Sequence, residues 1–147
     1  MSAFFPHFMA GITVGVLSTG ILGINDYPDI NMYTALPIVA GIGGALTPDM
    51  DIKSTSSMLM YLFYVVLAGI LFFTGYPLYG FLLLLYSLLP QFFHHRGFIH
   101  SFLFCILSSV GLFFICKYNL DSLSLIIAIT CAYFFGFLTH VVLDEAD

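Results

Sequence analysis

Long apolar runs alternate with short polar segments along the whole chain, and proline, asparagine, aspartate or glycine residues bound each run. The predicted spans are residues 8–24, 33–47, 57–74, 76–90, 101–116 and 122–141. No polar segment between them is long enough to fold separately, so residues 1–147 are expected to form one integral membrane domain. The expected fold class is all-α, a polytopic transmembrane helical bundle of about five to six spans.

Two of the predicted spans, 33–47 and 76–90, are short. A helix of about 15 residues rises only ~22 Å, whereas the hydrocarbon core of a bilayer is ~30 Å thick. We therefore expect some segments to be re-entrant or broken, which a membrane tolerates only where the backbone is covered by protein or lines a wet cavity. In the first span, Gly11, Gly15 and Thr19 form a stripe of small residues that predicts close approach of another helix. Such faces also allow a homo-oligomer.

The composition separates this chain from soluble globular domains. Hydrophobic residues make up 61% and charged residues 7%, and the mean hydropathy is +1.06, so the chain is expected to be an integral membrane protein with membrane lipid as a partner. A net charge of −5 without a basic cluster argues against nucleic acid as a partner. Cys105, Cys116 and Cys131 lie in apolar runs without CxxC spacing, which is typical of small buried hydrophobic residues.

The beginning of the chain, MSAFFPHFMAGITVGVLSTG, is interpreted as a retained first span, because it shows neither the basic region nor the small-residue cleavage site of a secretory signal.

The polar ends of the spans carry the candidate chemistry. If the chain crosses the membrane at each span, His7, TPDMD (47–51), HHRGFIHS (94–101) and HVVLD (140–144) emerge on one face. The opposite face receives NDYPDIN, TGY and KYNLDS. Every histidine thus falls on one side of the membrane, which predicts a functional site there. Ser101, which ends HHRGFIHS, is expected to cap the helix that follows.

The residue types in these segments suit a metal ion. His140 and Asp144 are four residues apart, so they share one face of a helix. Asp49 and Asp51 can point the same way from a turn. Imidazoles and carboxylates without thiolates suit zinc, manganese, iron or cobalt, and more than four candidate ligands leave room for one or two ions.

In order and type, His7, TPDMD, HHRGFIHS and HVVLD resemble the motifs of the YdjM-like family of membrane-bound metal-dependent hydrolases, which includes LexA-regulated inner-membrane proteins of bacteria. That family shows a leading histidine, an LPDxD-type turn, an HRGxTHS-type segment and a terminal HLLLD-type motif. The likeness covers essentially the whole chain and implies a hydrolase of the prokaryotic cytoplasmic (inner) membrane that uses a divalent metal, with zinc expected first. A looser likeness to zinc-dependent phospholipases C suggests a small phosphoester or lipid substrate.

Carried over residue by residue, the resemblance implies these metal ligands: His7, Asp49, Asp51, His100, His140 and Asp144. Asp49 could instead orient a ligating histidine. Arg96 is expected to bind a phosphate oxygen. His95 or His94 is expected to act as general acid for the leaving group while a metal-activated water attacks.

Three alternatives compete with this interpretation. A type 2 phosphatidic acid phosphatase also ends in an HxxxD motif, but its lysine- and arginine-rich phosphate motifs are missing from a sequence that has only 3 Lys and Arg residues. A metal carrier is expected to place its ligands at mid-span depth, whereas these residues sit at span ends. A structural or regulatory membrane protein with a degenerate metal site is the non-enzymatic alternative.

Overall fold

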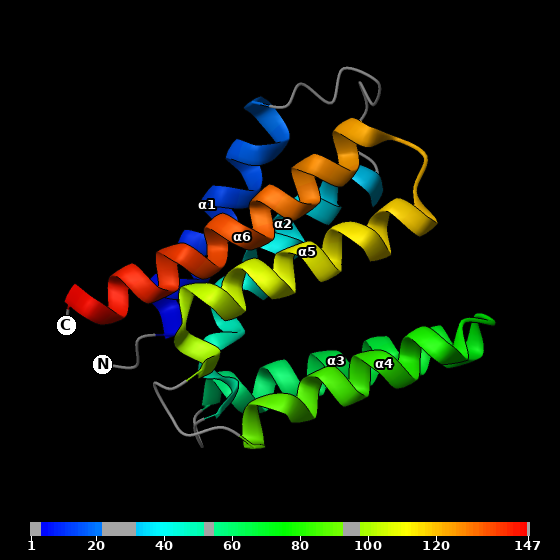
Figure 1. The fold of residues 1–147 in the computed structure, drawn as a ribbon, viewed down its shortest axis with the longest axis horizontal. Helices are drawn as coiled ribbons and strands as arrows, with labels where there is room; N and C mark the ends of the chain where they lie inside the picture. Colours follow the sequence, from blue (N-terminus) through cyan, green and yellow to red (C-terminus); the bar gives the residue numbers. More distant parts are fainter. Residues whose placement is uncertain (1–3, 22–31, 52–54, 93–97, 147) are drawn as a thin grey trace.

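The computed structural model describes residues 4–21, 32–51, 55–92 and 98–146 (Figure 1). Within these ranges the chain forms α-helices and short 3-10 helices and no strand, so the predicted all-α class is confirmed. The α-helices are α1 (Phe4–Ile21), α2 (Met32–Leu46), α3 (Thr55–Phe73), α4 (Pro77–Leu88), α5 (Phe102–Asn119) and α6 (Leu123–Ala146). The 3-10 helices are η1 (Pro48–Asp51), η2 (Leu89–Phe92) and η3 (Phe98–His100).

Two of the described helices are long and apolar enough to cross a membrane. These segments are Phe102–Asn119 in α5 and Leu123–Asp144 in α6. The other apolar helices offer shorter stretches, and α2 and α4 have only 15 and 12 residues. The structure therefore supports a helical membrane protein, and two of its helices meet the length of a span.

Helices α1 and α2 approach each other closely through glycines. A Cβ atom added at Gly11 would lie 2.7 Å from the Cα of Ile42, and one added at Gly15 would lie 2.5 Å from the Cα of Ile38. No side chain fits at either position without moving the backbone. The close approach predicted from Gly11 and Gly15 is confirmed, and the partner helix is α2 of the same chain.

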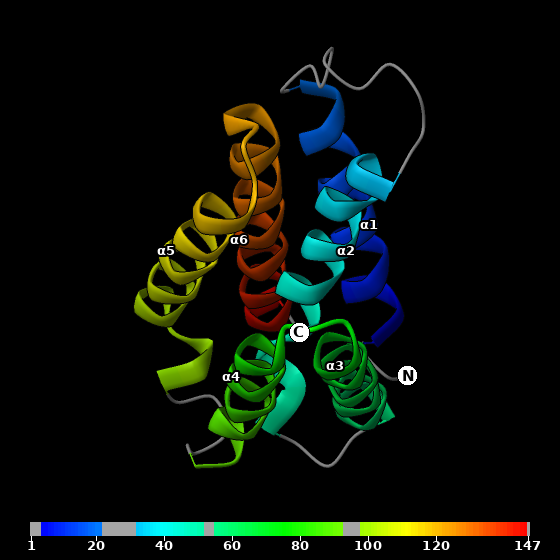
Figure 2. The same ribbon diagram turned by 90° about the vertical axis from the view of Figure 1, so that its right-hand side faces the viewer.

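Glycines also allow α2 and α6 to pack closely against each other. A Cβ atom added at Gly136 of α6 would collide with the carbonyl oxygen of Gly41, and one added at Gly44 of α2 would collide with that of Tyr133. Helices α1, α2 and α6 thus meet backbone against backbone, and we call them the three-helix core (Figure 2). Helix α5 packs beside α6, where Cys116 joins a buried cluster with Leu125 and its neighbours on α6.

Helices α3 and α4 form a hairpin that lies along one side of the other helices (Figure 1). Gly75 takes a positive φ of 91° in the turn between them, which glycine adopts without the steric cost of a side chain. The hairpin packs on the three-helix core mainly through side chains, with Met60 and Tyr64 against Leu46 at the end of α2.

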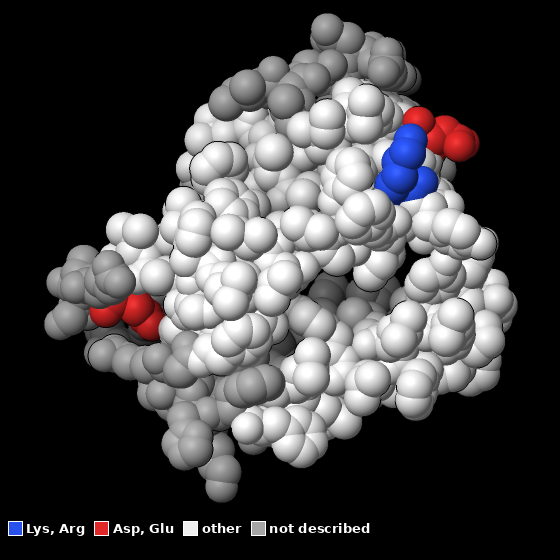
Figure 3. Space-filling view, viewed as in Figure 1, with Lys and Arg blue, Asp and Glu red and all other residues white. Residues whose placement is uncertain are grey.

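Among the described residues, the charged side chains that Figure 3 shows lie in two groups at different ends of the molecule, and uncharged surface separates them. Large apolar side chains point outward from the helices between these ends. Phe73, for example, exposes 94% of its surface, and Leu62 and Phe81 are more than half exposed. Such a surface is typical of a protein whose apolar sides are covered by lipid.

Candidate metal centre

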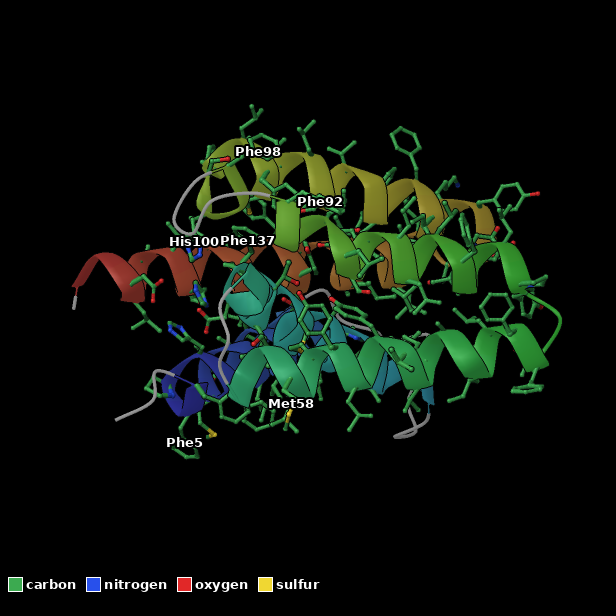
Figure 4. All side chains as sticks on the ribbon, turned by 90° about the horizontal axis from the view of Figure 1, so that it is seen from below. Phe5, Met58, Phe92, Phe98, His100 and Phe137 are labelled. Atoms are coloured by element: carbon green, nitrogen blue, oxygen red, sulfur yellow. The ribbon has the colours of Figure 1, made fainter. Side chains whose placement is uncertain are left out.

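Five predicted ligands come together at the end of the molecule where α1 begins and α6 ends (Figures 1 and 4). We call them the His/Asp cluster: His7 on α1, Asp49 on η1, His100 on η3, and His140 and Asp144 on α6. Segments from the whole length of the chain therefore contribute to one site.

A proline positions Asp49. A residue that precedes proline avoids the helical region of backbone angles, and α2 accordingly ends at Leu46, two residues before Pro48. Pro48 then begins η1, which turns the chain back towards α6. Asp49 is buried there, with its Oδ1 3.5 Å from Nε2 of His140.

Ser101 positions His100. Its side-chain oxygen accepts a hydrogen bond of 3.1 Å from the backbone N–H of Phe104, and its backbone is extended. Ser101 is therefore the N-cap of α5, as predicted from the sequence. The cap fixes the point at which the chain leaves η3, so His100 is held at the start of α5.

Asp144 lies at the centre of the His/Asp cluster. Its Oδ1 is 3.3 Å from Nε2 of His7, and its Oδ2 is 3.3 Å from Nε2 of His140 and 3.8 Å from Nδ1 of His100. The rings of His7 and His140 stack with a centroid distance of 4.0 Å. One carboxylate therefore faces three imidazoles from three different elements.

These distances fit a shared metal ion. Zinc lies about 2.0–2.2 Å from nitrogen and oxygen ligands, so two donor atoms on one ion are at most ~4.4 Å apart. The distances between imidazole and carboxylate atoms in the His/Asp cluster, 3.3 to 3.8 Å, fall inside this limit. Two groups have ligand atoms within 4.8 Å of one another, namely His7, Asp49 and His140, and His100, His140 and Asp144. His140 belongs to both groups.

The tautomer of His140 is set by the backbone. Its Nδ1 lies 2.6 Å from the carbonyl oxygen of Ala45, which can only accept a hydrogen bond, so Nδ1 carries a proton. In the neutral ring Nε2 then presents a lone pair. This atom is buried and has no hydrogen-bond partner among the described residues, although carboxylate oxygens of Asp49 and Asp144 lie 3.5 and 3.3 Å away. A lone pair facing carboxylates is the arrangement that a cation between them would stabilise.

The charges around the His/Asp cluster also favour a bound cation. Asp49 is 7% exposed, and burial of carboxylates is costly unless a positive charge compensates for them. In the described part of the chain the one lysine or arginine is Lys117, which lies in the last turn of α5, at the opposite end from His100. Compensation by a lysine or arginine is thus not seen within the described residues.

Several predicted site residues cannot be compared with the structure. His94, His95 and Arg96 lie outside the described residues, so their predicted catalytic roles stay predictions. Asp51 ends η1, and the structure describes only its backbone. Of the six predicted ligands, the other five form the His/Asp cluster, and their binding of metal stays a prediction as well.

A group of buried hydroxyls was not predicted from the sequence. Tyr86 of α4 and Tyr133 of α6 share a hydrogen bond of 2.7 Å, and the hydroxyls of Thr47 and Tyr64 are 3.5 Å apart. One signal could have found part of it, because Tyr133 precedes His140 by seven residues and therefore lies on the same face of α6. The carbonyl of Ala45, which orients His140, leaves no signal in the side-chain pattern.

A family model described as YdjM inner membrane protein matches residues 1–146, which include the whole His/Asp cluster. No curated protein and no solved structure matches the chain.

Proposed function

The chain belongs to the YdjM inner membrane protein family, and on that premise we propose that it is a membrane-embedded, metal-dependent hydrolase with its metal at the His/Asp cluster. The protein resides in the inner membrane. The proposed substrate is a small phosphoester or a lipid that reaches the site at one membrane face.

The observation that carries the proposal is the environment of His140 Nε2. This atom is buried, its ring is oriented by the bond from Nδ1 to Ala45, and it faces the carboxylates of Asp49 and Asp144 without a hydrogen bond among the described residues. Metal-ligating histidines commonly donate their second ring nitrogen to a backbone carbonyl in this way. In the neutral ring the lone pair of Nε2 faces the negative carboxylate oxygens, and a cation bound between them would turn this repulsion into attraction.

Zinc is the ion that the proposal favours, with manganese, iron or cobalt as alternatives, because the donors are imidazoles and carboxylates. The His/Asp cluster would hold it, and Asp51 is a further proposed ligand that leaves room for a second ion. When bound, a divalent ion polarises a phosphoryl oxygen and makes water acidic enough to supply a nucleophile near neutral pH. Arg96 is proposed to bind a phosphate oxygen, and His95 or His94 to protonate the leaving group.

We propose a polytopic bundle of about five to six spans for the membrane arrangement. The position of the His/Asp cluster supports this, since it joins the start of α1, the segment after α2, the segment before α5 and the end of α6. Four helices therefore run between this end and the other. The short helices α2 and α4 would have to be tilted, or re-entrant beside protein.

The metal content of the purified protein tests whether the His/Asp cluster binds a metal ion. We expect near-stoichiometric zinc in the wild type and a sharp loss in Asp49→Asn, which removes a buried charge from the cluster. Asp121→Asn is the matched control, because Asp121 is exposed in the segment between α5 and α6, away from the cluster. Full zinc occupancy in Asp49→Asn would rule out the site as described.

An assay of phosphoester cleavage tests whether the protein is a hydrolase. Phospholipids and chromogenic phosphoesters are supplied in detergent with zinc, manganese or cobalt added back, and we expect cleavage by the wild type and by Asp121→Asn but not by Asp49→Asn. A wild type that keeps its metal and cleaves nothing across the panel would favour the non-enzymatic alternative, a structural or regulatory protein. Zinc transport into vesicles without cleavage would favour the carrier.

A further inference from the structure

An apolar groove lies between α1 and α6. It is lined by Ala10, Leu138, Thr139, Val142 and Leu143, and its volume is about 320 Å³. The only polar group among these side chains is the hydroxyl of Thr139, which donates a hydrogen bond of 2.7 Å to the carbonyl of Gly136. That hydroxyl is therefore satisfied within its own helix, and we call this feature the α1/α6 groove.

The α1/α6 groove lies beside the His/Asp cluster. Ala10 follows His7 by three residues, which is about one turn of α1, and Leu143 directly precedes Asp144. His7 and Asp144 themselves bridge the two helices at 3.3 Å. Leu138 lies six residues before Asp144 on α6, a rise of about 9 Å. The groove therefore starts next to the cluster and extends along α6 from Leu143 to Leu138, with Ala10 of α1 on its other side.

The surface around the groove is apolar and exposed. Val142 lines the groove and is 57% exposed, and the outward side chains of Met9 and Phe135 on the same two helices are also apolar and exposed. In an inner membrane protein such a surface faces acyl chains. The groove is continuous with it, so an acyl chain can enter from the bilayer without crossing a polar barrier.

We propose that the α1/α6 groove binds one acyl chain of a membrane phospholipid whose phosphoester lies at the His/Asp cluster. The inference rests on the proposed function and narrows its substrate from a small phosphoester or a lipid to a phospholipid with a long acyl chain. A tail inside the bilayer and a phosphoester at the membrane face match the orientation of a lipid in its leaflet. Binding of the unreactive tail would position the reacting phosphoester.

Photolabelling tests the binding site directly, with or without activity. The purified wild type is placed in phosphatidylglycerol vesicles that contain a trace of phosphatidylglycerol with a diazirine in one acyl chain, and the labelled residues are mapped after illumination. We expect labelling to concentrate around Ala10 and residues 138–143, and to fall severalfold in Thr139→Leu, which fills the groove. Even labelling over other exposed apolar residues, such as Leu62 and Phe81, would overturn the proposal.

Thr13→Leu is the matched control for Thr139→Leu. Thr13 is exposed on α1, does not line the groove, and its hydroxyl also donates to a carbonyl of its own helix, that of Met9 at 2.9 Å. The two variants therefore make the same chemical exchange inside and outside the groove. Equal loss of labelling in both would show that the effect does not come from filling the groove and would overturn the proposal.

Kinetics test whether the bound lipid is the substrate. Thr139→Leu should raise KM for a long-chain phospholipid about tenfold, which corresponds to about 1.4 kcal/mol and to roughly two buried methylene groups. The KM of Thr139→Leu for a short, soluble chromogenic phosphoester should change less, because that substrate places no acyl chain in the groove, and Thr13→Leu should keep the wild-type KM for both substrates. Leu143→Ala, which enlarges the groove, should lower KM for chains that carry a methyl branch.

The failures of the two proposals are distinguishable. A wild type without metal or hydrolysis would contradict the proposed function, whereas the labelling pattern would still decide whether the groove binds an acyl chain. Labelling in the groove together with an unchanged KM in Thr139→Leu would mean a structural lipid and would overturn the assignment of the substrate. Equal loss of both activities in Thr139→Leu would mean that the residue supports the fold, and would overturn it too.

Discussion

The three-helix core and the α3–α4 hairpin are held in different ways. In the core, backbone lies against backbone, because Gly136 and Gly44 leave no room for a side chain between α2 and α6. The hairpin meets the core through flexible or polar side chains such as Met60, Tyr64 and Tyr86. The core and the segment directly after α2 supply four residues of the His/Asp cluster, whereas the described part of the hairpin supplies none.

This difference shows where positional precision is needed. Between helices in lipid, association depends on van der Waals packing and hydrogen bonds rather than on the hydrophobic effect, and small residues give the closest packing. A metal site tolerates errors of only a few tenths of an ångström in its ligand distances. The His/Asp cluster lies at the ends of helices that are fixed against each other. We therefore expect substitutions in the three-helix core to reduce metal binding, and substitutions in the hairpin to leave it unchanged.

The largest expected effect is that of Gly136→Val. The new side chain would meet the Gly41 carbonyl and the backbone nitrogen of Ala45, so α6 would have to move away from α2 and His140 would lose its bond to Ala45. Such overpacking costs about 1–3 kcal/mol and occasionally more, and we expect zinc to be lost as well. Thermal unfolding and zinc content in detergent measure both.

Gly111→Val is the control for Gly136→Val, because a Cβ atom at Gly111 of α5 meets nothing within 4 Å. It should leave both the unfolding temperature and the zinc content close to those of the wild type. If Gly136→Val behaved like Gly111→Val, the core would be less tightly packed than described and the contrast with the hairpin would fail.

The second prediction concerns His140→Ala. It removes the ring that faces both Asp49 and Asp144, so those carboxylates lose their shared neighbour and any ion loses a central ligand. We expect zinc content to fall to near background while helical content by circular dichroism is kept. Tyr64→Phe, a change in the hairpin, should keep its zinc. Normal zinc content in His140→Ala would place the metal elsewhere.

Much of the fold could be predicted from the sequence because apolar runs and their polar boundaries report helices directly. Each of the six predicted runs overlaps one α-helix. The last run was predicted to end at residue 141, whereas α6 continues to Ala146. Loss of apolar residues marks the end of a membrane segment, while a helix continues as long as its backbone bonds are satisfied. Asp144 lies on the part of α6 that continues past the predicted span, on the same helix as His140, as their spacing predicted.

The site was predictable in part. The order of apolar runs and polar segments was sufficient to predict that His7, His100 and His140 lie at one end of the molecule, and the structure places them there. The pairing of helices was less accessible, because helices that are apolar on all sides give no stripe that identifies the buried face. The stripe of Gly11 and Gly15 predicted a close approach without naming α2 as the partner. The contact from Ala45 to His140 depends on a backbone carbonyl, which every residue has.

The third prediction is that a chelator destabilises the wild type. A ligand present at 100 times its dissociation constant stabilises the folded state by about 2.7 kcal/mol, which for a chain of this size corresponds to roughly 5–10 °C in unfolding temperature. We expect EDTA to remove this increment. EDTA should not change the unfolding temperature of Asp49→Asn, which is expected to lack the metal already. Zinc added after EDTA should restore the unfolding temperature of the wild type but should not raise that of Asp49→Asn. An unfolding temperature that EDTA leaves unchanged in both would argue that no metal supports the core.

The smallest effect is expected from the hydroxyls that join the hairpin to the core. Tyr86 and Tyr133 share the bond of 2.7 Å between α4 and α6, and hydrogen bonds between membrane helices contribute only about 0.6 kcal/mol on average. Tyr86→Phe and Tyr133→Phe should therefore each lower stability by ~0.5–1 kcal/mol. The double variant should lose less than the sum, because the two hydroxyls act on one bond.

The exposed Tyr118 on α5 provides the control, and Tyr118→Phe should change stability by less than about 0.5 kcal/mol. The decisive measurement is zinc content, which all of these variants should keep, because the described part of the hairpin supplies no residue of the His/Asp cluster. If Tyr86→Phe released zinc while Tyr118→Phe did not, the hydrogen bond between Tyr86 and Tyr133 would be needed to hold α6, and with it His140 and Asp144, in place. The site would then depend on the hairpin as much as on the three-helix core, and the division between the two regions would have to be abandoned.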